Sequence, residues 1–287
     1  TRVLVVDAGV RHAIDIVRSL GSRGIHVSIV VKDGRPPVSY SRHVNETHVF
    51  PLDGNDMEPS IAWLESLARQ NRYDAIIAAG LDGFRILSCG LERLSAYSAV
   101  PVSSWPLFAI AEDKADTTRY GERVGVPTPM TYYPDGPDDL EQFRDIAYPV
   151  VVKARRGQGH FAYAGSYAEL RDVVYPQICA EVEDQMAEGV YPILQEFIKG
   201  KGHGFYALMN HGELVAYFIH ERIAGSGHCC RGRFPLLVDA DGRRRRREPG
   251  RDATHGRYLS VAEHGHCPLD CRRQATAMVG LCIARHA

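Results

Sequence analysis

The chain has 287 residues, of which 45% are hydrophobic and 9% aromatic, enough for two domains that each bury a core. Its formal net charge of −1 gives no electrostatic reason to expect a nucleic acid or an anionic membrane surface as a partner. No apolar run approaches the roughly 20 residues of a membrane helix, and no basic-then-apolar leader opens the chain, so we expect a soluble, cytoplasmic protein.

Strand and helix patterns alternate over about the first hundred residues. Short apolar runs predict strands at Arg2–Val6, Val27–Val31, His48–Phe50 and Asp74–Ala78. Apolar residues at helical spacing predict helices around Ile14, Val17 and Leu20, and around Ile61, Leu64 and Leu67. Such alternation implies a parallel sheet covered by helices on both faces. We therefore expect an α/β fold with a Rossmann-like domain over residues 1–108.

A second unit of mixed α+β character is expected from residue 109. A helix from Asp113 to Val124 ends at Pro127 and Pro129, which forbid its continuation. Further strands are predicted at Tyr148–Lys153, Tyr191–Phe197, Gly204–Met209 and Glu213–His220, with a long polar helix over Tyr167–Glu188. The turn Asn210-His-Gly212 joins the last two strands as a hairpin.

A glycine-rich segment follows the strand that ends at Lys153. It reads Lys153-Ala-Arg-Arg-Gly157-Gln-Gly159-His-Phe-Ala-Tyr-Ala-Gly165. Backbone N–H groups of such loops can wrap phosphate oxygens, and a preceding lysine supplies a cation for the same oxygens. Glycines between strands are also ordinary turns, and a Walker loop is excluded because its lysine follows the glycines and opens a helix. The segment alone leaves both interpretations open.

Several motifs in a fixed order resemble the ATP-grasp superfamily. They are Glu112-Asp113-Lys114, Gly125-Val-Pro-Thr-Pro129, the strand ending in Lys153 with its glycine loop, and Leu194-Gln-Glu-Phe-Ile-Lys-Gly200. In addition, Tyr40-Ser-Arg42 and Gly80-Leu-Asp82-Gly83 look like the substrate-side domain of carboxylate–amine ligases. The resemblance covers residues 1–223. It implies an incomplete ATP-grasp domain over 109–223, with a lid at about 109–190 and the start of a central sheet at 191–223.

The resemblance also implies roles for individual residues. In that family two lysines contact the ATP phosphates, a glycine loop acts as a mobile lid, and a hinge strand binds the adenine edge. These roles fall on Lys114, Lys153, Arg156 (or Arg155), Gly157, Gly159, Gln195, Glu196, Phe197 and Ile198, with His203 near the ribose and Arg222 near the phosphates as the catalytic residue. Structural alternatives stay open: a solvated helix lysine for Lys114, a strand-end lysine for Lys153, an edge-strand carboxylate for Glu196, a surface histidine for His203 and a surface ion pair for Arg222.

The implied function is ATP-dependent ligation, in which Mg-ATP activates a small-molecule carboxylate as an acyl phosphate and an amine captures it. Relatives supply magnesium ligands from a late Glu-x-Asn element, but the last asparagine here is Asn210, so no metal ligand is assigned. That lack favours a nonenzymatic ATP-binding protein as the alternative. A third hypothesis, an NAD-dependent oxidoreductase, is poor because residues 7–13 lack Gly-x-Gly-x-x-Gly.

The tail from residue 224 to 287 differs from the rest of the chain in its charge and its cysteine content. Residues 225–287 carry 12 Lys and Arg against six Asp and Glu, and five of the seven cysteines. Three hypotheses fit: a truncated or out-of-frame segment, a divergent and disordered tail, or a zinc site built from His228, Cys229, Cys230, His264, His266, Cys267 and Cys271. The odd cysteine count argues against a disulfide framework, and the arginine run Arg243–Arg247 lacks the interleaved aromatics of a nucleic-acid site. The sequence patterns identify neither the carboxylate and amine substrates nor the oligomeric state.

Overall fold

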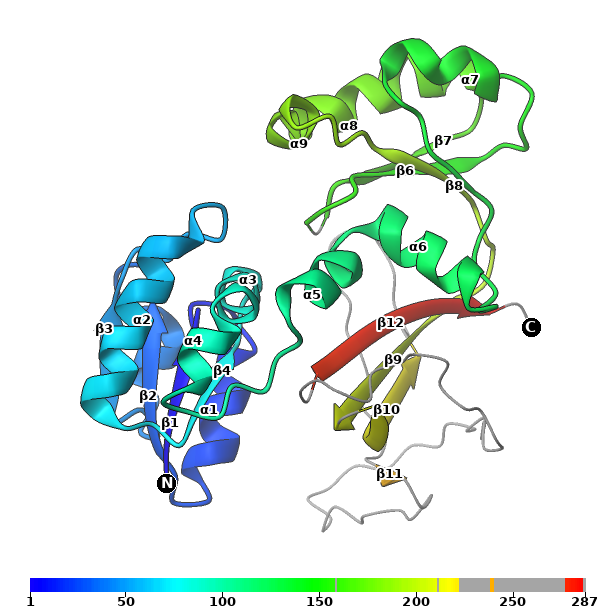
Figure 1. Cartoon of the computed structure of the whole chain (residues 1–287). Coiled ribbons are helices and arrows are strands. Elements are labelled where there is room, and N and C mark those ends of the chain that lie inside the picture. Colours follow the sequence, from blue (N-terminus) through cyan, green and yellow to red (C-terminus); the bar gives the residue numbers. More distant parts are fainter. Residues whose placement is uncertain (158, 211, 222–237, 240–276, 286–287) are drawn as a thin grey trace. The chain divides into compact units, whose positions relative to one another are not determined.

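The computed structural model describes residues 1–157, 159–210, 212–221, 238–239 and 277–285 (Figure 1). The chain divides into two compact units, the first containing Thr1–Phe108 and the second Ala109–Tyr206, with later segments shared between them. Within the described ranges, none of the helices has the length and apolar character needed to span a bilayer.

The first unit is built on a four-stranded parallel sheet. Its elements are β1 (Arg2–Val6), α1 (Ala13–Gly21), β2 (His26–Val31), η1 (Pro37–Tyr40), β3 (Glu46–Val49), α2 (Met57–Asn71), β4 (Ala75–Ala78), α3 (Leu81–Cys89), α4 (Leu91–Ser95) and the beginning of α5 (Trp105–Glu112). The strand order is β3-β2-β1-β4, with Val3 of β1 opposite Val27 on one side and Ala75 on the other.

Each face of this sheet has its own buried core. Leu4 and Val6 pack with Leu64 of α2 and Ile86 of α3, whereas alternate residues of β1, such as Val5, pack in a separate cluster with α1. A strand buried on both faces must be apolar at successive positions, which is why β1 reads as a continuous apolar run. The expected parallel sheet with two covered faces is confirmed.

The second unit is built on an antiparallel sheet. Its elements are α6 (Lys114–Arg123), β5 (Thr131–Tyr132), η2 (Pro137–Phe143), β6 (Val150–Lys153), β7 (Phe161–Ala164), α7 (Tyr167–Glu169), η3 (Leu170–Val174), α8 (Tyr175–Glu181), α9 (Glu183–Ala187) and β8 (Ile193–Glu196). The strand order is β5-β8-β6-β7. Val150 and Val152 of β6 pack with Tyr175 and Ile178 of α8 on one face, and α6 lies on the other side of the sheet (Figure 1).

Two elements differ from the sequence expectation. The segment expected as one helix over 167–188 is helical from 167 to 181, with a π-helical turn (η3) ahead of Pro176, which has no N–H to donate, and the helix is interrupted at Val182, which adopts φ −134° between α8 and α9. The glycine-rich segment 157–165 is not one loop either, because β7 occupies its second half. The connection between β6 and β7 is therefore residues 154–160.

A third sheet has the order β11-β10-β9-β12. It consists of β9 (Lys201–Asn210), β10 (Glu213–Glu221), β11 (Val238–Asp239) and β12 (Ala277–Arg285). The expected hairpin between β9 and β10 is confirmed, and Gly212 in its turn has φ +85°, a value that suits glycine. The described residues of the basic tail thus supply two strands to this sheet.

Candidate functional site

Lys114 joins helix α6 to the connection between β6 and β7. Its backbone N–H donates to the carbonyl of Arg155 at 3.0 Å, and its Nζ donates to the carbonyl of Gly157 at 2.8 Å and to that of Arg155 at 3.3 Å. Burial lowers the pKa of Lys114, and the positive charge of Lys153 lowers it further. The two lysines, which are 39 positions apart in the sequence, therefore lie within electrostatic reach of each other beside the glycines.

Asp113 fixes the start of α6 to the same connection. Its side chain is buried, 5% exposed, and Oδ1 caps the helix by accepting from the backbone N–H groups of Ala115 and Asp116 at 2.9 and 3.2 Å. The Arg155 guanidinium donates to the same carboxylate from two nitrogens, Nε to Oδ1 at 2.9 Å and a terminal nitrogen to Oδ2 at 2.8 Å. Arg155 is therefore engaged in a bidentate ion pair within the protein.

The strand register places a set of polar and aromatic side chains on the sheet face opposite α8. Lys153 lies directly opposite Phe161 on β7 and Ile193 on β8. In the neighbouring row Val151 lies opposite Tyr163 and Gln195, and Gln195 lies opposite Thr131 of β5. Directly opposite residues share a face, so Lys153, Gln195, Phe161 and Tyr163 project to one side of the sheet.

Three aromatic side chains form an exposed row on this unit. Phe161, Tyr163 and Phe197 are 47%, 53% and 44% exposed. The rings meet edge to face, with centroid distances of 5.9 Å between Phe161 and Tyr163 and 5.6 Å between Tyr163 and Phe197. Sequence reasoning included Phe197 but missed the other two. The alternation Phe161-Ala-Tyr163-Ala, typical of a strand with one aromatic face, was the available signal.

The remaining lid and hinge residues lie on β8, β9 and the connection. Glu196 is exposed and its carboxylate accepts from the backbone N–H of Met130 at 3.0 Å. The Arg156 guanidinium forms an ion pair of 2.6 Å with Glu188. Gly157 and Gly159 have φ +78° and +90°, a backbone region that favours glycine. Ile198 follows Phe197, and His203 lies half-buried in β9.

The geometry therefore brings together residues from three separate places in the sequence: Lys114, the stretch from Lys153 to Gly157, and Gln195. Arg222 and the residues of the hypothetical zinc site lie outside the described residues. Among the residues that the structure does describe, no group of three His, Cys, Asp or Glu side chains is arranged to hold a metal ion.

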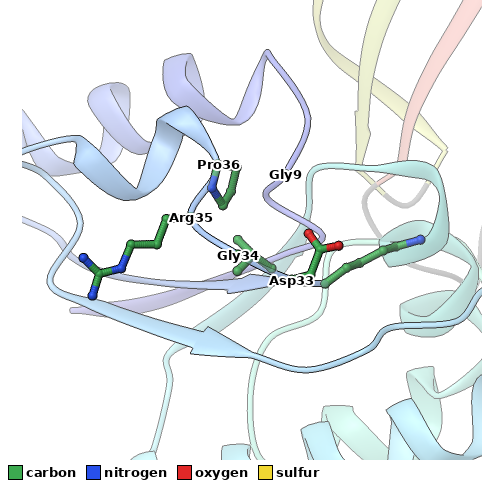
Figure 2. Close-up of a pocket in the computed structure, with 7 residues that line it drawn as sticks. Gly9, Asp33, Gly34, Arg35 and Pro36 are labelled. Carbon is green, nitrogen blue, oxygen red and sulfur yellow. The ribbon is translucent and has the colours of Figure 1, made fainter.

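The first unit contains a cavity of about 350 Å³ at the carboxyl ends of β1 and β2 (Figure 2). It is lined by Gly9, Val31, Lys32, Asp33, Gly34, Arg35 and Pro36. Figure 2 shows the Asp33 carboxylate and the Arg35 guanidinium on opposite sides of Gly34. Burial opposes the charged form of Lys32, but its hydrogen bond and ion pair with Asp82 outweigh that effect and raise its pKa. The cavity edge thus holds charges of both signs.

Sequence comparison finds one curated relative and no matching family model. The relative is the carbamoyl-phosphate synthase of Methanobrevibacter smithii, 28% identical over 126 residues, which are 43% of this chain and 31% of that protein.

Structure comparison finds several solved chains with the same arrangement. The L-amino acid ligase of Bacillus licheniformis matches with a TM-score of 0.60 at 15% identity, over 83% of this chain and 54% of that one. The biotin carboxylase domain of Hydrogenobacter thermophilus 2-oxoglutarate carboxylase, solved with MgADP, ADP and bicarbonate, matches with a TM-score of 0.60 at 18% identity, over 79% and 51%. N5-carboxyaminoimidazole synthetase of Staphylococcus aureus matches with a TM-score of 0.59 at 13% identity, over 79% and 55%. The chain spans about half the length of these solved chains.

Proposed function

Because this chain has the ATP-grasp fold, we propose that it is the nucleotide-binding part of an ATP-dependent carboxylate–amine ligase. The observation that carries the proposal is the convergence of Lys114 and Lys153 beside the connection that contains Gly157 and Gly159. Two ammonium groups and exposed backbone N–H groups complement a polyphosphate. Similarity to an L-amino acid ligase and to a synthetase supports the reaction class.

In the proposed reaction a carboxylate oxygen attacks the γ-phosphorus of ATP and displaces ADP. The resulting acyl phosphate is then attacked at its carbonyl carbon by an amine, which releases inorganic phosphate and gives up a proton to form the amide. Lys114 and Lys153 hold phosphate oxygens and offset the charge that accumulates on them as the bond to ADP breaks. The role of the glycine connection is to close over the same oxygens.

The adenine ring is assigned to the aromatic row and the hinge. The exposed faces of Tyr163 and Phe161 lie on the same side of the sheet as Lys153, and Phe197 extends the row from the end of β8. An exposed aromatic ring near two cations suits a purine nucleotide, since the base can stack on one ring while its phosphates are paired. The backbone at Glu196–Ile198 supplies the hydrogen bonds to the base edge.

Magnesium enters the proposal only as part of the Mg-ATP complex. The described residues offer no group of three metal-ligating side chains, so no step is assigned to a metal ion held by them. The cavity of the first unit is proposed to receive one of the two small-molecule substrates, because the Arg35 guanidinium at its edge suits a carboxylate.

The test is calorimetric titration of Mg-ATP into the purified chain. Saturable binding is expected, and Lys153→Ala should weaken it by about 1.5–3 kcal/mol, the loss of one charged hydrogen bond. Arg171→Ala is the matched control: it removes a cation of the same unit that is paired with its neighbour Asp172 and is half exposed, so ATP affinity should stay unchanged.

Two outcomes would overturn parts of the proposal. Equal affinity of wild-type protein and Lys153→Ala would remove the lysine pair from the nucleotide site. Binding of Mg-ATP without any turnover, across a panel of amino acids and other small carboxylates with amine acceptors, would leave the nonenzymatic ATP-binding hypothesis in place of ligation.

A further inference from the structure

Lys153 is held by a chain of hydrogen bonds that crosses three strands. Its Nζ donates to Oε1 of Gln195 at 2.5 Å, Nε2 of Gln195 donates to Oγ1 of Thr131 at 3.0 Å, and Oγ1 of Thr131 donates to the carbonyl of Pro129 at 2.8 Å. Gln195 and Thr131 are each 8% exposed. The two side chains are directly opposite each other on β8 and β5, while Lys153 is the diagonal neighbour of Gln195 on β6.

The two end groups of this series of hydrogen bonds determine which group donates at each step. The Pro129 carbonyl can only accept, so the single Thr131 hydroxyl proton points toward it. The Thr131 oxygen is then left to accept, which requires the NH2 group of Gln195 to face it. The amide oxygen of Gln195 must therefore face Lys153, whose ammonium can only donate. One hydroxyl thus sets the orientation of a buried amide, and the amide sets the position of a charged group.

We propose that Gln195 and Thr131 are positioning residues that hold the Lys153 ammonium in place for phosphate. Both polar groups of the Gln195 amide are committed to Thr131 and Lys153. A buried amide used in this way acts on the nucleotide through Lys153 and not by contact with the base. The inference rests on the proposed nucleotide site and deepens it, because it assigns the residue before the hinge to phosphate binding instead of base recognition.

The informative variant is Thr131→Val, which keeps the shape of the side chain and removes the hydroxyl. The Gln195 NH2 group then loses its acceptor, and the amide is free to rotate its donors toward Lys153. Thr131→Ser restores the hydroxyl. Thr128→Val is the matched control, because the Thr128 hydroxyl reaches only the exposed carboxylate of Glu122 at 3.4 Å. Far-ultraviolet circular dichroism checks that each variant folds.

The first readout is the acetylation rate of the Lys153 amine, measured by mass spectrometry against the exposed Lys199 in the same chain. Losing the Gln195 acceptor destabilises the ammonium relative to the neutral amine, so Thr131→Val should raise the rate at Lys153 by about threefold or more. Thr131→Ser and Thr128→Val should match the wild-type rate. An unchanged rate in Thr131→Val would overturn the proposal, and this readout needs no nucleotide.

The second readout compares ATP, ADP and adenosine by calorimetry. Thr131→Val should weaken ATP and ADP about tenfold and leave adenosine unchanged, because only the phosphates depend on Lys153. Equal weakening of adenosine would mean that Gln195 contacts the base, which contradicts the proposal. If the wild-type chain binds none of the three ligands, the proposed function fails, and the acetylation rates still decide whether Gln195 and Thr131 position Lys153.

Discussion

Replacing Asp113 by serine should loosen the start of helix α6 by about 2–3 kcal/mol. Serine is a good N-cap, so the variant keeps the helix cap and removes only the carboxylate that binds Arg155. Removing one partner of a buried ion pair costs about 3–5 kcal/mol because the other charge is left unpaired. The Arg155 side chain is 21% exposed and keeps a contact of 3.2 Å with Asp116, so the cost should fall below that range.

Hydrogen exchange of the α6 amides measures this loss directly. A change of about 2–3 kcal/mol corresponds to roughly 30- to 150-fold faster exchange over residues 114–123. Asp113→Ala also removes the cap and should add about 1 kcal/mol. Asp172→Ser is the control: its ion pair with Arg171 is exposed and lies outside α6, so the exchange of the α6 amides should stay at the wild-type rate. Exchange of α6 within twofold of the wild type in Asp113→Ser would refute the assignment of Asp113 as the clamp on Arg155.

Four other outcomes are expected. Burial and the charge of Lys153 lower the pKa of Lys114 below its ordinary 10.5, so ATP affinity should fall as pH rises through that lowered pKa, and Lys153→Met should move the fall to higher pH. Tyr163→Ala should weaken ATP binding by about 1–3 kcal/mol through lost stacking, whereas Tyr163→Phe should not, as calorimetry would measure. Gly80→Ala would place a Cβ 2.0 Å from Oδ2 of the buried Asp7, and should cost about 1–3 kcal/mol in urea denaturation, whereas Gly9→Ala meets nothing within 4 Å. Burial raises the pKa of Cys179 to about 11, so at pH 8 iodoacetamide should modify the exposed Cys89 well before Cys179, as peptide mass mapping would detect.

The sequence was sufficient for features that are local. The strand Arg2–Val6 and the helix after Asp113 were predicted because apolar period and capping residues act within one element. The position of Lys153 at the end of β6 was predicted for the same reason, since an apolar run directly precedes it. The helix over 167–188 was predicted correctly as far as residue 181, but its π-helical turn ahead of Pro176 and its interruption at Val182 were not predicted, because the polar and apolar spacing continues through both.

Contacts between distant positions were beyond sequence reasoning. Asp113 and Arg155 are 42 positions apart, and their ion pair exists only because α6 lies against the connection after β6. Arg155 was considered as a phosphate-binding lid residue, but its guanidinium is engaged with Asp113. Likewise, Gln195 was considered as a cofactor contact, and only the register of β5, β8 and β6 places it between Thr131 and Lys153.

The two faces of strand β6 have different roles: one face packs in the core, and the other carries the lysine proposed to bind phosphate. Val150 and Val152 are fully buried against α8, so shortening either one removes apolar contacts and leaves a cavity in the core. Lys153 projects from the opposite face of the strand, where its Nζ donates to Gln195. Substitutions at alternate positions of this strand should therefore have different effects. Those on the α8 face should lower the free energy of unfolding. Those at Lys153 should change nucleotide affinity with little loss of stability.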